Sequence, residues 1–408
     1  MTTTVTPQAD PVSALSTIPV PVGAATPDTT GFRDPSGESG APRGFVAALE
    51  GMRGLAALGV VITHVAFETG ATGTPVLGRI WDRFGMAVAV FFALSGFLLW
   101  RPHAAAARGG DTAPGARRYL LHRAARILPA YWVVVCAVLI LLPTAVHPGS
   151  VKLWLANLAL LQVYVPLTLT DGLTQMWSLS VEAAFYLVLP VLALALRRLR
   201  GPAARWRAPI LLTLALVSLI WNFLPVPTPA GTYADNWLPA YLPWFAAGML
   251  LAELVDIAHR ATEPPRWQRL LGNRWPMWAA ASTAFLLSAT VIAGPPGLQR
   301  AAPGQYATKM ALGAVVGFGL LAPLVLGTGR HRWLGGRIAA AVGRWSYGIF
   351  IWHLAVLTMM FPMFGFLPFS GGFLHVLALT VCFTLPLAAV SYALVEEPAR
   401  RWVRRRFG

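Results

Sequence analysis

The sequence predicts an all-α membrane protein, a polytopic bundle of about ten transmembrane helices. Hydrophobic residues make up 56% of the 408-residue chain and charged residues only 12%, whereas soluble domains contain about 25% charged residues. Apolar stretches long enough to cross the ~30 Å hydrocarbon core of a bilayer recur along most of the chain. Composition and recurrence together indicate an integral membrane protein.

Ten stretches have the length and hydropathy expected of spanning helices. They cover residues 45–67, 84–100, 127–146, 176–196, 208–224, 237–255, 276–293, 308–326, 345–362 and 373–394. An even number of spans places both ends of the chain on the same side of the membrane. The apolar run 153–165 is shorter, and we expect an interfacial or re-entrant segment there.

The ends of the chain differ from this transmembrane domain, which we expect over residues 44–401. Residues 1–43 are rich in Thr, Pro, Ala and Ser and lack apolar periodicity, so they are predicted to form a disordered cytoplasmic tail. No basic segment is followed by an apolar run and a small-residue cleavage site, so we expect no cleaved signal peptide. Residues 402–408 are predicted to be a basic cytoplasmic tail.

The distribution of Lys and Arg predicts the orientation. Of 32 such residues, 24 lie in five connections on one side of the predicted bundle, which by the positive-inside rule is the cytoplasmic side of the plasma membrane. The net charge of +16 then reflects topology and contact with anionic lipid headgroups. Nucleic-acid binding is disfavoured, because the arginines are spread over five loops and do not gather in one module.

Two ionisable residues interrupt the first apolar stretch. Arg53 and His64 are eleven residues apart, so on a helix they share one face and are separated by roughly 16 Å. A cationic side chain at this depth costs at least ~2.5 kcal/mol, and such residues usually face a bundle interior or a wet cavity. The pair therefore indicates a functional site. Cys136 and Cys382 lie in predicted spans, and we expect free thiols there, with neither a disulfide nor a metal site.

Six motifs resemble, in the same order, those of the integral-membrane acyltransferase 3 family. They are LEGMRGLAALGVVITH at 49–64, FFALSGFLL at 91–99, RAARILPAYW at 123–132, WSLSVEAAFYLVLP at 177–190, SYGIFIWH at 346–353 and EEPARR at 396–401. One departure is Ala183–Ala184, where many members carry Glu-Gln. The resemblance implies an enzyme that moves an acyl group, commonly acetyl, from cytoplasmic acyl-CoA to a hydroxyl of a glycan, lipid or natural product.

The resemblance and the chemistry of acyl transfer together suggest three catalytic residues. His64 is the candidate general base, because its pKa lies nearest the operating range; a covalent acyl-histidine remains an alternative. Arg53 is expected to contact the donor or to polarise the thioester oxygen. Glu182 is expected to pair with Arg53 or to orient His64, or else to make a plain interhelical hydrogen bond.

Four further residues are candidates for binding the donor. Arg123 and Arg126 lie three apart, on neighbouring helical turns, where they could grip CoA phosphates; the alternative is that they only set topology. Pro129 is expected in the first turn of the same helix. Ser95 could donate its hydroxyl to the site or serve only small-residue packing. Tyr347 is expected near the donor path.

Other polar residues are expected to have structural roles. His353 lies six residues after Tyr347 and so on roughly the opposite helix face, and we treat it as a packing or supporting histidine. Glu253 is expected at the cytoplasmic rim without a role. The sequence Glu396-Glu397-Pro398 is expected to end the last span at the inner surface.

The rival interpretation is a proton-coupled transporter or flippase of a polar or acylated solute, which would use Arg53, His64 and Glu182 as a proton relay. Cleavage of a thioester would separate the two classes. High Ala, Arg, Gly and Pro usage is typical of a GC-rich bacterial genome. The sequence leaves open the acceptor and the acyl chain length.

Overall fold

All regular structure in the described part of the chain is helical, as the sequence predicts. The computed structural model describes residues 43–142, 150–329 and 331–407, and no strand occurs among them. The predicted tail 1–43 lies outside the described residues except for Arg43, as do residues 143–146 at the end of the third predicted span.

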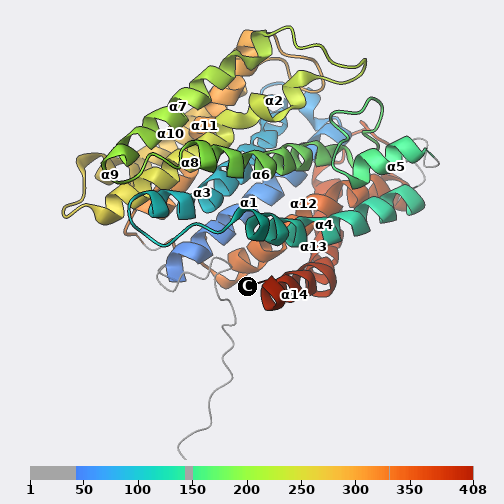
Figure 1. The fold of residues 1–408 in the computed structure, drawn as a ribbon. Helices are drawn as coiled ribbons and strands as arrows, with labels where there is room; N and C mark the ends of the chain where they lie inside the picture. Colours follow the sequence, from blue (N-terminus) through green and yellow to red (C-terminus); the bar gives the residue numbers. More distant parts are fainter. Residues whose placement is uncertain (1–42, 143–149, 330, 408) are drawn as a thin grey trace, which may run out of the picture. The chain divides into compact units, whose positions relative to one another are not determined.

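The helices follow one another through short connections (Figure 1). The first half of the chain contains α1 (Arg43–Glu68), η1 (Ala71–Gly73), α2 (Leu77–Arg83), η2 (Phe84–Met86), α3 (Ala87–Ala107), α4 (Ala116–Leu141), α5 (Val151–Leu158), η3 (Thr174–Met176), α6 (Trp177–Ala195) and η4 (Gly201–Trp206). The second half contains α7 (Arg207–Ser218), η5 (Leu219–Phe223), η6 (Ala234–Asn236), α8 (Leu238–Arg260), α9 (Arg266–Leu271), α10 (Arg274–Ser288), η7 (Val291–Ala293), α11 (Pro303–Leu326), α12 (Arg337–Phe364), α13 (Phe373–Ser391), the π-turn η8 (Tyr392–Glu396) and α14 (Glu397–Phe407).

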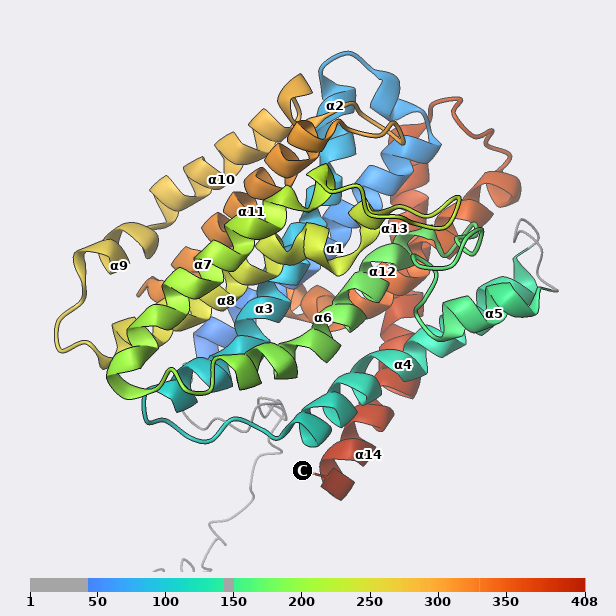
Figure 2. The same cartoon turned by 45° about the horizontal axis from the view of Figure 1, so that its top comes forward.

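Nine helical segments among the described residues are long and apolar enough to cross a membrane. They coincide with nine of the ten predicted stretches. The other stretch, 276–293, contains α10, which has 15 residues and a length of about 22 Å, and which lies alongside α11 (Figure 2). The count of ten spans is therefore not confirmed. The short run 153–165 forms part of α5 and the turns after it, and α5 has only eight residues.

Two helix boundaries differ from the sequence prediction. α4 begins at Ala116, so Pro129 lies inside the helix and not in its first turn. The prediction was wrong because the helix begins with a basic, polar segment that precedes the apolar stretch. The helix also does not stop at Glu396–Pro398: the π-turn leads directly into α14, and Pro398 falls in the first turn of α14, where its missing N–H is tolerated. The end of the span at the inner surface stays a prediction. α14 includes most of the predicted basic tail, up to Phe407.

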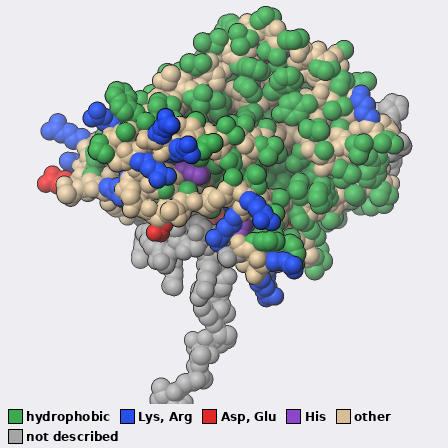
Figure 3. Space-filling model, in the orientation of Figure 1, with side chains coloured by type: hydrophobic (Ala, Val, Ile, Leu, Met, Phe, Trp, Pro, Cys, Tyr) green, Lys and Arg blue, Asp and Glu red, His purple; other side chains and the backbone are tan. Residues whose placement is uncertain are grey.

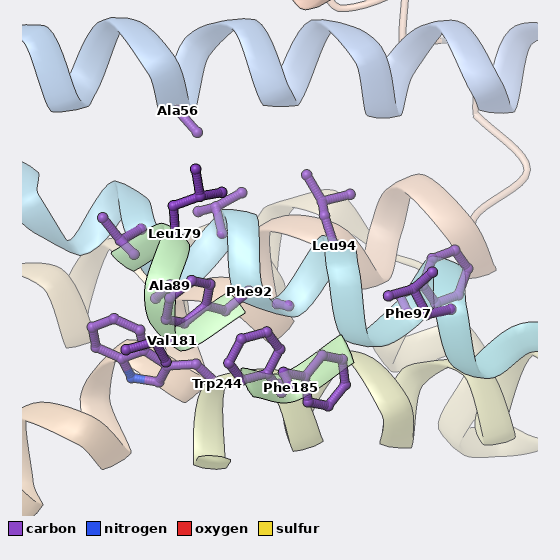
Figure 4. Packing of buried hydrophobic residues seen from close by; sticks show 14 of the residues in the cluster. Ala56, Ala89, Phe92, Leu94, Phe97, Leu179, Val181, Phe185 and Trp244 are labelled. Carbon is purple, nitrogen blue, oxygen red and sulfur yellow. The ribbon is translucent and has the colours of Figure 1, made fainter. Parts of the chain in front are cut away.

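The core is formed where α3, α6 and α8 meet. Phe245 of α8 lies between Phe92 of α3 and Phe185 of α6, with ring centroids 4.3 Å and 4.0 Å away; Figure 4 shows Phe92 and Phe185 approaching each other from their two helices. α3 and α8 can approach closely because Gly248 has no side chain, and a Cβ there would overlap the carbonyl oxygen of Ala93. Small residues of this kind drive helix packing in membranes.

A second close contact joins α1 to α12. A Cβ on Gly343 of α12 would overlap the backbone of Glu50 in α1, so only glycine permits this approach. The contact continues along both helices. It places Arg53 and His64 of α1 against the part of α12 that contains Tyr347 and His353.

Charged side chains are unevenly distributed over the surface. Lys and Arg gather along the lower and left edge of the view in Figure 3, whereas the surface above and to the right is largely apolar. This edge contains the end of α6, α9 and α14, and exposed arginines there include Arg197, Arg198, Arg200, Arg266, Arg269, Arg401 and Arg405. We call this edge the basic face.

Candidate active site

A cavity lies between α1, α3, α4, α6 and α12, and six of the seven predicted site residues line it. They are Arg53, Ser95, Arg123, Arg126, Glu182 and Tyr347. Its volume is about 60 Å³, and Phe91 and Phe350 form part of its apolar wall. We call it the arginine cavity. Its polar residues come from motifs scattered along the sequence, and they meet here because each polar side chain avoids lipid by facing the bundle interior.

Three arginines and one carboxylate line the arginine cavity. Arg53 lies 3.6 Å from Glu50, one turn earlier on α1. The Nε atom of Arg123 is buried without a hydrogen-bond partner. The hydroxyl group of Ser346, which also lines the cavity, is likewise buried without a partner. Buried polar groups are normally satisfied, and the excess of positive charge favours an anionic or strongly polar ligand in this place.

Glu182 is held by two hydroxyl groups. Its Oε1 atom accepts hydrogen bonds from Ser95 of α3 and from Tyr186, one turn further along α6. The tyrosine oxygen is 2.6 Å away. The hydrogen bond from Ser95 is the interhelical contact expected as the alternative for Glu182. Glu182 is also an electrostatic neighbour of Arg53, and its role toward Arg53 or His64 stays a prediction. Ser95 supplies its hydroxyl to the site, while Gly96 next to it provides the close helix contact with α8.

Tyr347 connects α12 to α4. Its hydroxyl donates a hydrogen bond of 2.8 Å to the backbone carbonyl of Ile127, beside Arg126. The aromatic ring lines the arginine cavity, so Tyr347 lies where a donor path is expected, although its role stays a prediction.

His64 lies outside the arginine cavity and forms a pair with His353 of α12. Nδ1 of His64 is 2.8 Å from the carbonyl oxygen of Val60 and 3.3 Å from Nε2 of His353. Nδ1 of His353 is 2.8 Å from the carbonyl oxygen of Phe350. Carbonyl oxygens only accept hydrogen bonds, so both Nδ1 atoms carry the ring proton. This tautomer leaves Nε2 of His64 with the lone pair that a general base requires.

An aromatic pair separates the two polar regions. Phe91 and Phe350 line the arginine cavity, with ring centroids 6.2 Å apart. The ring of Phe350 lies 6.1 Å from that of His353 on the other side. Phe350 therefore contacts the arginine cavity and lies near His353 of the histidine pair.

Glu396 is a candidate that the sequence analysis did not assign to the site. The π-turn places it against α4 and α12, where it is 4% exposed and has Arg126, Arg400 and Arg53 as electrostatic neighbours. Its Oε1 atom has no hydrogen-bond partner. π-turns inside helices occur frequently at functional sites, and the signal in the sequence was a paired glutamate immediately before a proline.

Glu253 has a structural role that the sequence analysis did not assign. It is fully buried, and its carboxylate accepts hydrogen bonds from Arg108 at 2.6 Å, from Arg207 at 2.7 Å and from the indole of Trp100 at 2.7 Å. These partners were not predicted because both arginines come from segments far away in the sequence, and the expected rim position stays a prediction. Within the described residues, no group of three His, Cys, Asp or Glu side chains could hold a metal ion.

The bundle of long apolar helices and the match to a family model identify a membrane-embedded acyltransferase. The family model described as an acyltransferase domain matches residues 46–394, and the chain belongs to this family, the acyltransferase 3 family. No solved structure matches the chain.

Two curated relatives illustrate the similarity. The chain is 22% identical over 399 residues to the peptidoglycan O-acetyltransferase OatA of Listeria monocytogenes, with 88% of this chain and 56% of the relative covered. It is 26% identical over 385 residues to the acyltransferase MdmB of Streptomyces mycarofaciens, with 88% of this chain and 92% of the relative covered. The chain thus spans little more than half the length of OatA.

Proposed function

We propose that the protein transfers an acyl group, with acetyl as the principal case, from acyl-CoA to a hydroxyl of a glycan, glycolipid, envelope lipid or natural product. The observation that carries this proposal is the arginine cavity, which has three arginines against one carboxylate and lies next to a histidine pair. Arginines recognise phosphates, and a histidine of the observed tautomer suits proton removal. The name of the relative OatA supports a glycan hydroxyl as one class of acceptor.

The proposed reaction balances without any group beyond donor and acceptor. The acceptor hydroxyl oxygen attacks the thioester carbonyl carbon while Nε2 of His64 takes the hydroxyl proton. Arg53, roughly 16 Å from His64 along α1, holds the donor arm so that the thioester reaches His64. The carbon–sulfur bond then breaks, and the CoA thiolate receives the proton from His64. Formation of an acyl-histidine before transfer is the alternative course of the same exchange.

The donor is proposed to arrive from the cytoplasm. The positive-inside rule supports a cytoplasmic position for the basic face with its exposed arginines, and we propose that both ends of the chain lie on that side of the plasma membrane. Counted along α1, Arg53 lies nearer the basic face and His64 about 16 Å further from it. The acyl group would therefore move inward past Arg53, and Phe91 and Phe350 would have to turn aside to let it reach His64.

Release of free CoA tests this proposal. The purified protein is mixed with acetyl-CoA and a panel of glycosides and glycolipids, and free thiol is measured with time. We expect thiol release that depends on protein and on acceptor. A transporter with a proton relay would release no CoA with any acceptor. Absence of CoA release with every acceptor would therefore overturn the proposal.

A further inference from the structure

A second cavity lies on the basic face, at the ends of α3 and α6. His103 and Thr112 line it on the side of α3 and the following loop, and Arg197, Arg200 and Arg207 line it on the side of α6 and α7. Its volume is about 280 Å³, close to the lower limit of ~300 Å³ for small-molecule pockets. We call it the α3–α6 cavity.

The rear wall of the α3–α6 cavity is fixed by Arg207. This arginine is 2% exposed and donates hydrogen bonds of 3.3 Å to the carbonyls of Leu196 in the turn after α6 and His103 in α3. Its charge is balanced by Glu253 at 2.7 Å. Arg207 therefore holds the two walls together, and the positive charge offered to a ligand comes from Arg197 and Arg200, whose side chains are exposed. No carboxylate is found among the described lining residues.

The α3–α6 cavity is aligned with the arginine cavity. Ser95 of α3 and Glu182 of α6 are hydrogen-bonded and line the arginine cavity, whereas His103 of α3 and Ala193 of α6 line the α3–α6 cavity. These residues lie eight and eleven positions further along their helices, or about 12–16 Å nearer the basic face. The ends of α3 and α6 meet there in Figure 2.

The sizes of the two cavities suit the two ends of one molecule. The arginine cavity, at about 60 Å³, has room for an acyl thioester end but not for a nucleotide. Acyl-CoA has a narrow flexible arm at one end and a 3′-phosphorylated adenosine at the other. We propose that the α3–α6 cavity binds the adenosine 3′-phosphate end of the donor, with Arg197 and Arg200 on the phosphate. This assignment rests on the proposed function, and Arg123 and Arg126 then act closer to the thioester.

The test compares Arg197→Gln/Arg200→Gln with a matched control, Arg198→Gln, which removes a neighbouring exposed arginine that does not line the cavity. The double variant should raise the KM for acetyl-CoA at least tenfold, because it removes both guanidinium contacts to the 3′-phosphate. The KM for acetyl-dephospho-CoA, which lacks the 3′-phosphate, should stay within twofold. The control should resemble the wild type with both donors. Equal KM changes with the two donors, or none, would contradict the assignment.

A binding measurement separates this inference from the proposed function. Calorimetry with adenosine 3′,5′-bisphosphate, in nanodiscs of neutral phosphatidylcholine alone, should show binding to the wild type and to Arg198→Gln, and a loss of at least tenfold in the double variant. Absence of binding to the wild type would overturn the assignment even if CoA release is normal. If the variants differ only in anionic nanodiscs, a lipid headgroup occupies the cavity and the assignment is wrong. Failure of CoA release with intact nucleotide binding would refute the function alone.

Discussion

At the scale of single residues, the arginine cavity assigns different tasks to residues that the sequence shows only as charges in apolar stretches. Arg53 lies on α1, deeper along the proposed donor path, whereas Arg123 and Arg126 lie on α4 toward the basic face. Contacts to phosphates are the same in the ground state and in the transition state, while a contact that positions the thioester for reaction affects the chemical step. The arginines should therefore differ in kinetics.

Arg123→Ala and Arg126→Ala are expected to raise the KM for acetyl-CoA with kcat largely preserved, because they remove uniform binding. Arg53→Ala should lower kcat and kcat/KM together, and Arg53→Lys should restore little, since a point charge does not reproduce the guanidinium fork. Titrations of acetyl-CoA measure both quantities. Arg118→Ala is the control, because Arg118 is exposed on the same helix as Arg123. If all variants match the control, these arginines only set topology.

The sequence predicted which residues enter the site better than it predicted their partners. Depth in an apolar stretch requires Arg53 and Glu182 to face inward, so their gathering follows from the cost of exposing charge to lipid. Pairings across helices depend on the rotation and depth of each helix, which no single stretch contains. For this reason the contact between His64 and His353, 289 positions apart, was not predicted.

At the scale of elements, the apolar stretches were found reliably and their ends were not. Hydropathy marks the part of a helix inside hydrocarbon, but α4 begins at Ala116, well before the apolar residues start. The same limit applies at the other end of the chain, where α14 extends the last helix to Phe407. The basic extension of α4 has a functional consequence: it makes Arg123 and Arg126 part of a rigid helix wall rather than of a loose loop.

Hydropathy does not indicate the π-turn η8, although this element has a large effect on the site. A π-turn adds a residue to one helical turn and so changes which side chains face inward. Here it directs Glu396 toward the arginines, while Glu397 pairs with Arg401 on the surface at 2.7 Å. Two adjacent glutamates thus have different environments, one buried beside the site and one exposed to ion pairing at the basic face.

At the scale of the whole molecule, the function depends on which face meets the cytoplasm. Arg200 and Thr228 lie before and after the helical segment Gly201–Phe223, formed by η4, α7 and η5, which is long enough to cross the membrane. The uneven distribution of arginine predicts that Arg200 is cytoplasmic and Thr228 is not. This arrangement allows transfer to an acceptor outside the cell without export of CoA.

Single cysteines at Arg200 and Thr228, in a variant without Cys136 and Cys382, test this orientation. An impermeant thiol reagent should label the cysteine at 228 in intact cells. The cysteine at 200 should react only after the cytoplasmic side is opened. If the cysteine at 200 but not the cysteine at 228 is labelled in intact cells, the topology is the inverse of the proposed one. A cytoplasmic donor could not then reach the arginine cavity.

We propose that His64 removes the proton of the acceptor hydroxyl, and the rate of CoA release by His64→Ala is the measurement that tests this role. His375→Ala is the matched control, because His375 is an exposed histidine on α13. With acetyl-CoA and an active acceptor, the His64 variant should release thiol about 10²–10⁴-fold more slowly than the wild type, while the control should be unaffected. Turnover by a folded His64→Ala protein close to that of the wild type would contradict the claim.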